Sequence, residues 1–279
     1  MPTFRHDGRR LAYTIHGEGE RTTVLIHGLL FSQKMHLPLA TALAARGNRV
    51  VTLDLLGHGR SDRPRDMTQY SMALYGRQVI ALLDHLEVDR AVLAGTSLGA
   101  NAVLEVGALA PDRTQGLIVE MPVLDNALLG CAVAFTPLLL ALTFGAPGMR
   151  ILARAANLVP PGFVPWLADV GLDTIRQAPE PGAAVLQGLF FGRVAPPRSE
   201  REKIRTRTLV IGHRRDPVHP FSDSDGLVAE LPNARLLLAE SILELRTTPS
   251  RLTAEIGDFI DECWRARRRR SAPRARRVA

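Results

Sequence analysis

The 279-residue sequence contains few cysteines and few aromatic residues. It has only two cysteines, Cys131 and Cys263, far apart in the chain, so it predicts neither a disulfide framework nor a cysteine metal site. Aromatic residues make up 5% of the chain and apolar residues 46%, so aliphatic side chains must fill most of the core. This length is enough for one large core or for two compact domains.

The first twenty residues lack the continuous apolar stretch of a secretory signal peptide, so we expect a cytoplasmic protein. The formal charge of +7 is unevenly placed, because eight arginines lie between residues 265 and 277 and the rest of the chain is close to neutral. We expect residues 265–279 to form a disordered tail that either solubilises the protein or contacts an anionic membrane surface. No nucleic-acid-binding fold accompanies these arginines, so no specific nucleic-acid partner is expected.

Charged residues are absent from residues 126–149, a stretch long enough to span a bilayer. Its place between strands of one expected sheet argues against a span, because a spanning helix would put those strands on opposite sides of the membrane. We predict a buried or pocket-lining lid helix at this place. Contact with a membrane interface and a true span stay open as alternatives.

Short β-rich runs alternate with helical patterns along most of the chain, which predicts βαβ units and a mostly parallel sheet. Strands are expected near residues 3–6, 10–16, 22–27, 49–54, 90–94, 116–120, 208–212 and 234–239, with the first three forming a meander. Helices are expected near residues 34–46, 70–86, 99–111 and 221–231 and from Pro249 to about Trp264. Residues 122–200 hold no convincing strand. We therefore predict an α/β core of residues 1–121 and 201–264 with a helical cap inserted at 122–200.

The segment Gly95-Thr96-Ser97-Leu98-Gly99 matches the G-x-S-x-G pattern of a sharp turn from a strand into a helix. Such a turn exposes the serine hydroxyl, and its glycines avoid clashes around the bend. A β-rich run precedes this motif and a helix of small residues follows it, as the pattern requires. Ser97 is therefore the candidate nucleophile.

Acyl-transfer chemistry also needs two backbone N–H groups directed at the developing oxyanion. One comes from the residue after the nucleophile, which is Leu98 here, and the other from an early loop that follows a strand. The motif His27-Gly28-Leu29-Leu30 lies in such a loop and provides the N–H group of Leu29.

With the further motifs DLLGHGRSD at 54–62 and GHRRDPVHP at 212–220, the chain resembles the α/β-hydrolase superfamily, in its capped, lipase-like branch of serine hydrolases. The motifs follow the family's order and spacing over residues 3–264. The resemblance implies an eight-stranded, mostly parallel sheet flanked by helices, structural roles for His27 and His58, and no cofactor or metal. It also implies that Asp216, which follows the seventh strand, orients the catalytic base.

The family's catalytic histidine is missing from this sequence. Its usual place, about seven residues before a helix-starting proline, is occupied by Ile242, and no histidine follows His219. An isoleucine cannot accept a proton. Because the residue three positions after the acid often faces the pocket in this family, His219 is the first candidate for a relocated base. Further candidates are His36, Glu120, Glu240 and Glu244.

These features predict a serine hydrolase, esterase- or lipase-like, or an acyltransferase that acts on a small lipophilic carbonyl substrate with a nonstandard base. A serine at the turn, in place of an aspartate, argues against dehalogenase and epoxide-hydrolase chemistry of this fold. The apolar character of residues 122–200 suits a dry pocket for such a substrate. The missing histidine favours an alternative, a catalytically silent protein of the same fold that binds a lipophilic ligand or a protein partner.

Overall fold

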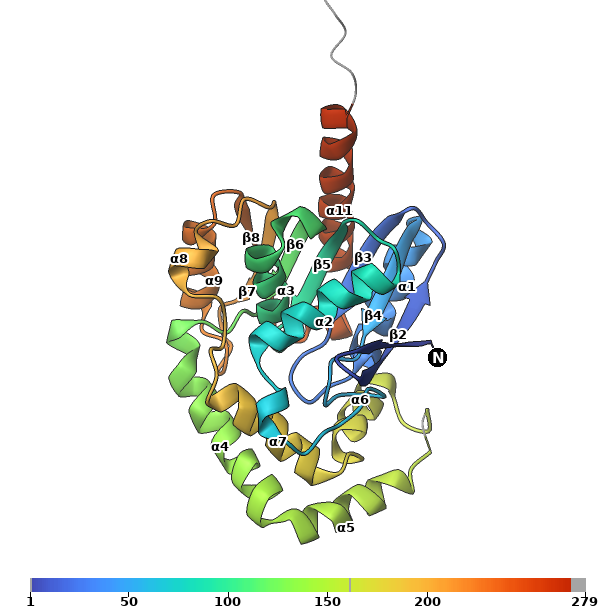
Figure 1. The fold of residues 1–279 in the computed structure, drawn as a ribbon, viewed down its shortest axis with the longest axis vertical. Helices are drawn as coiled ribbons and strands as arrows, with labels where there is room; N and C mark the ends of the chain where they lie inside the picture. The colour runs from blue at the N-terminus through green and yellow to red at the C-terminus, as the bar shows by residue number, and fades with distance from the viewer. Residues whose placement is uncertain (1, 161, 272–279) are drawn as a thin grey trace, which may run out of the picture.

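The computed structural model describes residues 2–160 and 162–271 and contains one eight-stranded sheet (Figure 1). The strands are β1 (Thr3–His6), β2 (Arg9–His16), β3 (Arg21–Ile26), β4 (Asn48–Leu53), β5 (Ala91–Thr96), β6 (Thr114–Glu120), β7 (Thr208–His213) and β8 (Ala234–Ala239). Their order across the sheet is β1-β2-β4-β3-β5-β6-β7-β8. β2 pairs antiparallel with β1 and β4, and all other pairs are parallel. The predicted fold class is confirmed.

The expected meander of the first three strands is wrong. β2 pairs with β4, and β3 lies on the far side of β4, between β4 and β5. A run of strand-forming residues predicts that a strand exists, but its neighbours depend on where the following helix returns the chain. Here α1 (Leu37–Ala45) carries the chain from β3 back into the gap beside β2.

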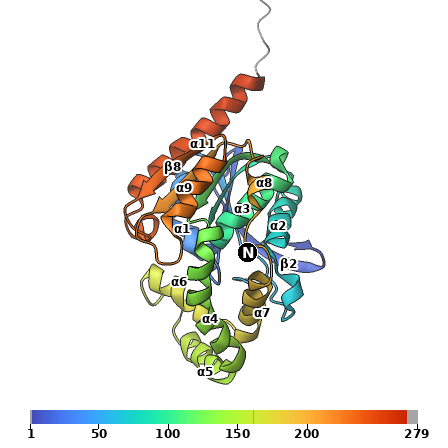
Figure 2. The ribbon, with the colours of Figure 1, turned by 90° about the vertical axis from the view of Figure 1, so that its left-hand side faces the viewer.

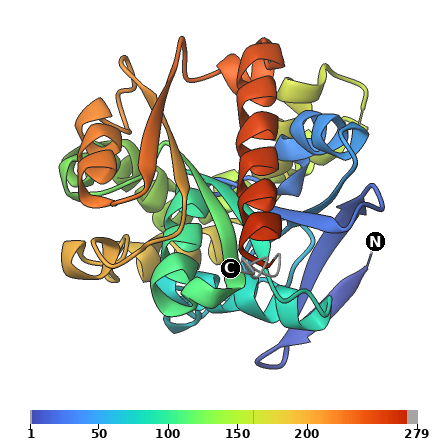
Figure 3. The same ribbon diagram turned by 90° about the horizontal axis from the view of Figure 1, so that it is seen from above.

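Helices cover both faces of the sheet. α2 (Met72–His85), α3 (Leu98–Leu109) and α9 (Phe221–Glu230) contribute Val79, Leu104 and Leu227 to one apolar layer. α1 and α11 (Ser250–Ser271) contribute Leu43, Ile256 and other side chains to the layer on the opposite face. Seen from above, α11 lies across the sheet on that face (Figure 3). The parallel strands are accordingly buried on both sides, as their nearly continuous apolar sequences require.

The segment between β6 and β7 holds only helices among its described residues: α4 (Leu128–Phe144), α5 (Ala146–Asn157), α6 (Trp166–Ile175), α7 (Pro179–Phe190) and the short α8 (Arg198–Arg201). α4 to α7 lie together at one end of the molecule (Figure 2), and we call these four helices the cap. α4 was expected to be buried or to line a pocket. Of its residues only Leu142 is buried, while one face of the helix does line a pocket.

The C-terminal helix extends farther than the sequence suggested. α10 (Glu244–Thr247) precedes it, and α11 continues through Ser271, so residues 265–271 are helical where a disordered tail was expected. Arginine has a high intrinsic helix propensity, and it prolongs a helix whose first turns are already packed on the sheet. Residues 272–279, the rest of the expected tail, lie outside the described residues.

Candidate active site

Ser97 lies on the turn between β5 and α3, with backbone angles φ 53° and ψ −111°. This region is unfavourable for a residue with a side chain, so the surrounding structure must hold it. The two flanking glycines permit that packing. A Cβ atom on Gly95 would lie 2.1 Å from the backbone of Gly99, and one on Gly99 would lie 2.2 Å from the carbonyl oxygen of Ile26. Any side chain at either glycine would clash with the backbone, which explains why the motif has glycine at both positions.

The loop that follows β7 brings a carboxylate and an imidazole ring to Ser97. His219 Nε2 lies 2.9 Å from Ser97 Oγ, and His219 Nδ1 lies 2.9 Å from Asp216 Oδ2. The other carboxylate oxygen of Asp216 accepts the backbone N–H groups of Val218 and His219 at 2.8 and 2.9 Å. The carboxylate of Asp216 thus fixes both the loop and the imidazole ring of His219. Ser97, His219 and Asp216 form one hydrogen-bonded chain.

The electrostatics of this chain suit proton transfer from the serine. Burial acts to raise the pKa of Asp216, but the hydrogen bonds from His219 outweigh it and hold the pKa below its usual range. Asp216 is therefore a carboxylate near neutral pH, and it accepts the Nδ1–H of His219. That arrangement leaves Nε2 of the ring as the acceptor for the hydroxyl of Ser97.

The two predicted oxyanion donors lie beside Ser97. Leu98 opens α3, so its N–H group belongs to the first helical turn, where no intrahelical acceptor exists. Leu29 belongs to the loop after β3, next to Leu30, which has a positive φ of 63°. Both leucines line the same cavity as Ser97. Two such N–H groups are the donors that acyl-transfer chemistry requires for a negative oxygen.

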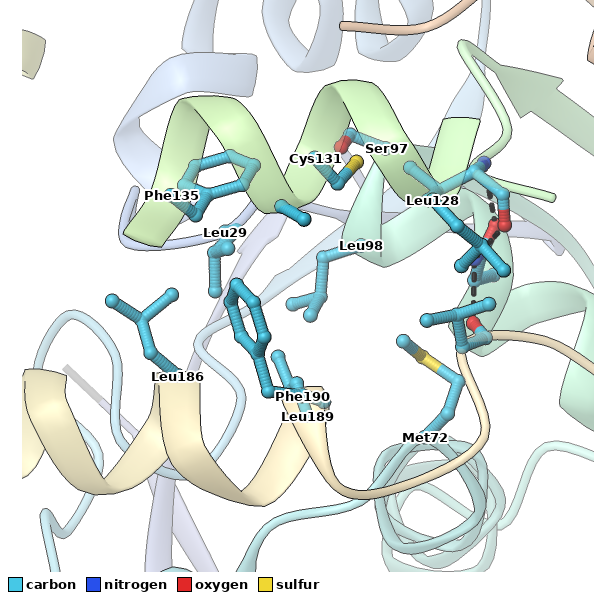
Figure 4. A pocket seen from close by; sticks show the side chains of 14 residues that line it. Leu29, Met72, Ser97, Leu98, Leu128, Cys131, Phe135, Leu186, Leu189 and Phe190 are labelled. Carbon is cyan, nitrogen blue, oxygen red and sulfur yellow. Dashed lines mark hydrogen bonds between the residues drawn. The ribbon is translucent and has the colours of Figure 1, made fainter. Parts of the chain in front are cut away.

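An apolar cavity of about 290 Å³ opens at Ser97 (Figure 4). Cys131 and Phe135 of α4 face it from one side, and Leu186 and Phe190 of α7 face it from the other. The polar side chains among its lining residues are few, and the thiol of Cys131 has a pKa raised to about 11 by burial. Such a cavity favours an apolar chain next to the hydroxyl of Ser97.

The other candidate bases do not contact Ser97. His36 Nε2 lies 3.0 Å from the carbonyl oxygen of Ile26, and burial lowers its pKa to about 3, helped by the charge of Arg246. His27 accepts the N–H of Leu55 at 3.1 Å. His58 Nδ1 likewise lies 3.0 Å from a backbone oxygen, that of Leu56. These three rings are buried structural groups.

The loop after β8, where the family's histidine was expected, has become a structural brace. Ile242 is partly exposed, and the nearby Glu244 accepts the N–H of Glu240 and pairs with Arg251. Arg246 Nη2 lies 2.8 Å from Glu120 Oε2 and 3.0 Å from Thr96 Oγ1, directly behind the turn of Ser97. The carboxylates of Glu120 and Glu244 are thus paired with arginines, and Glu240 is exposed to solvent.

Glu120 is held as an anion by this brace. Burial alone would raise its pKa, but the charge and hydrogen bonds of Arg246 and the hydroxyl of Thr96 lower it below its usual value. Both side chains of the pair are almost fully buried. The β8 loop therefore stabilises the strand that leads into Ser97, and the β7 loop meets the hydroxyl itself.

Two residues that the sequence interpretation missed attach the cap to the core. Asn101 on α3 donates to the carbonyl oxygens of Val123 and Val194, which lie near the two ends of the inserted segment. Asp223 on α9 accepts the N–H groups of Leu124 and Ala127, just before α4. Their partners are backbone atoms distant in sequence, so no residue pattern announces them.

Within the described part of the chain, no group of three or more His, Cys, Asp or Glu side chains is placed to hold a metal ion.

The family model described as alpha/beta hydrolase fold matches residues 23–141, from β3 into α4. The acetyltransferase component of an acetoin cleaving system from Pseudomonas putida is 39% identical over 105 residues, which are 38% of this chain and 28% of that protein. A haloalkane dehalogenase from Mycolicibacterium paratuberculosis is 29% identical over 154 residues, 55% of this chain and 46% of the dehalogenase. The chain thus spans less than half the length of these curated relatives.

Among solved structures, the enol-lactonase from Burkholderia xenovorans LB400 superimposes with a TM-score of 0.76 at 22% identity, covering 93% of this chain and all of the lactonase. At that identity the likeness shows the fold. The eight-stranded sheet, the sharp turn at Ser97 and the matching family model lead to one conclusion: the chain has the α/β-hydrolase fold.

Proposed function

We propose that this protein is a serine hydrolase that cleaves esters or lactones with an apolar acyl part, using Ser97 as nucleophile and His219 as base. The observation that carries the proposal is the pair of 2.9 Å contacts that joins Ser97 Oγ to His219 and His219 to Asp216. A partly buried, strained serine that opens to a cavity and contacts an oriented imidazole is the arrangement that activates a hydroxyl.

In the proposed reaction, Ser97 Oγ attacks the carbonyl carbon while His219 Nε2 takes the hydroxyl proton. The negative oxygen of the tetrahedral intermediate binds the N–H groups of Leu29 and Leu98. The carboxylate of Asp216 stabilises the imidazolium, which then gives its proton to the leaving alcohol. Water, deprotonated by the same ring, releases the acyl group and restores the serine.

The cavity and the comparisons support the substrate class. The cavity is lined mainly by aliphatic and phenyl side chains and is too small for a large polar group. One structural neighbour is an enol-lactonase. One relative is named as a haloalkane dehalogenase. We do not propose that activity for this chain, because Ser97 occupies the turn where the chemistry of dehalogenases of this fold requires an aspartate.

The geometry at His219 also weighs against the alternative of a catalytically silent protein. That alternative rested on the absence of a histidine at position 242, and another histidine is hydrogen-bonded to Ser97.

The test is hydrolysis of a series of aryl esters and lactones of increasing acyl length. Ser97→Ala should lower turnover by a factor on the order of 10⁴ or more. Cys131→Ala is the matched control, because it removes the other nucleophilic side chain of the cavity and should leave turnover largely intact. A wild-type protein without activity on any ester or lactone, or an active Ser97→Ala variant, would contradict the proposal.

A further inference from the structure

The outer face of α4 exposes large apolar side chains to water. The helical run Asp125–Phe144 is long and apolar enough to cross a membrane, and only 11% of its most apolar window is buried. Leu129, Val133 and Phe144 are 77, 69 and 80% exposed. The opposite face of the same helix packs toward α7 and lines the cavity at Ser97 (Figure 4). The helix is therefore apolar all round although the protein covers only one side of it.

α5 continues this surface with its amphipathic pattern reversed. The side chains that it buries are alanines, Ala146, Ala153 and Ala156. Ile151 and Leu152 are 67 and 47% exposed, while Met149 packs inward against the cap. A helix designed for contact with water would do the opposite. An exposed patch that extends over two helices marks an interaction surface more often than a water-facing one.

The charges of this region identify the kind of partner. Residues 126–168 contain two charged side chains, Arg150 and Arg154, both on α5. Arg150 pairs with Glu180 of α7 at 2.8 Å, so Arg154 carries the net positive charge of this surface. An apolar helical surface with basic residues is suited to a bilayer that carries anionic headgroups. A second copy of the same face would bring two copies of Arg154 together with no acidic side chain on α4 or α5 to pair with them, which disfavours a symmetric dimer through this surface.

The topology shows how such a surface would lie on a bilayer. The strands on either side of the insertion, β6 and β7, are parallel neighbours in one sheet. Asn101 holds backbone groups near both ends of the insertion. The chain therefore enters and leaves the cap on the same side, which argues against a single crossing of the bilayer by α4 and fits helices that lie along the interface. They form the end of the molecule opposite the C-terminal part of α11 (Figure 1).

We propose that the outer faces of α4 and α5 are a docking surface for anionic lipid bilayers. Docking through this face leaves a single helix, α4, between the bilayer and the cavity at Ser97. It also directs the basic end of α11 away from the membrane, so the arginine-rich C-terminus is not the anchor. The docking surface is independent of the proposed reaction, because it involves no residue of the Ser97–His219–Asp216 chain.

The test is flotation with phosphatidylcholine vesicles that contain or lack phosphatidylglycerol. Wild type and Ser97→Ala should bind the anionic vesicles equally well. The double variant Leu129→Gln/Phe144→Gln should bind about tenfold more weakly or worse, because each substitution removes an apolar side chain from the interface. The matched control is Ile15→Gln/Leu109→Gln. It removes two exposed apolar side chains of β2 and α3, outside the cap, and should bind as wild type does.

Two further variants separate the contributions of charge. Arg154→Gln should reduce the preference for anionic over neutral vesicles, since a basic residue near such a surface contributes about 1 kcal/mol, or about fivefold in binding. A chain lacking residues 265–279 should keep its binding.

Three results would overturn the proposal. One is equal flotation of wild type and Leu129→Gln/Phe144→Gln. Another is binding that disappears with residues 265–279 and not with the α4 variant, which would make the tail the membrane contact. The third is a wild-type dimer that ignores vesicles and becomes a monomer in Leu129→Gln/Phe144→Gln, which would make a second copy the partner.

Discussion

Two loops at the same edge of the sheet have taken different roles in this protein. The loop after β7, residues 214–220, provides Asp216 and His219, which reach Ser97 in one hydrogen-bonded chain. The loop after β8, residues 240–248, lacks a histidine and provides Arg246, which pairs with the buried Glu120 behind the same serine. One loop is placed to move a proton, and the other holds the turn in shape.

In the proposed mechanism, the base is defined by its reach and orientation, and not by its order in the chain. His219 lies three residues from Asp216, so a single tight turn can fix the acid and the base together. A base that arrives on its own loop needs that loop to be positioned independently. The β8 loop is thereby released to form the Arg246–Glu120 pair.

The largest effect should come from removing one side chain from each of these loops and comparing the two variants. His219→Ala removes the group in contact with Ser97 Oγ and should lower turnover by a factor on the order of a hundred or more. Ile242→Ala is the matched change in the β8 loop and should leave turnover nearly unchanged. Steady-state kinetics on one aryl ester measures both. If Ile242→Ala proves as harmful as His219→Ala, the division of roles is wrong.

A stability measurement tests the structural role of the β8 loop. Arg246→Met leaves the buried carboxylate of Glu120 without its cation and should lower the free energy of unfolding by about 3 kcal/mol. Arg90→Met, which breaks an exposed pair with Asp112, should cost less than about 1 kcal/mol. Urea denaturation compares the two variants with wild type. Equal, small losses would show that Arg246 does not brace the site.

The smallest effect concerns pH, through His36. Burial and the charge of Arg246 lower its pKa from 6.5 to about 3, so between these values the unfolded chain binds a proton that the folded protein does not. Protonation therefore favours the unfolded chain, and the contribution of His36 to the free energy of unfolding falls as pH falls, by up to about 1.4 kcal/mol per pH unit. His36→Gln should make the decline in unfolding free energy between pH 6 and 4 shallower by about that amount. An unchanged slope would mean that His36 titrates normally in the folded protein.

The sequence predicted those parts of the site that depend on local sterics. Gly95 and Gly99 are required by the turn itself, so the position of Ser97 could be inferred from five residues. Asp216 and His219 followed from the family's spacing together with the absence of a histidine at 242, and their contact is what the structure adds. Their catalytic roles stay predictions.

The remaining features depend on contacts that no sequence pattern encodes. Strand order follows from helix crossovers, which is why the expected meander was wrong. Asn101 and Asp223 bind backbone groups. Every residue has a backbone, so the types of the partner residues do not indicate these contacts. Charge repulsion predicts a disordered segment at residues 265–271, but helix propensity and continuity with a packed helix extend α11 through Ser271.

The most direct test of the central claim is the rate at which a fluorophosphonate labels Ser97 in wild type and in His219→Ala. Labelling reports activation of the hydroxyl without knowledge of the natural substrate. If His219 is the base, wild type is modified at Ser97 and His219→Ala reacts slower by a factor on the order of a hundred or more. Equal labelling rates in a folded His219→Ala variant would contradict the account.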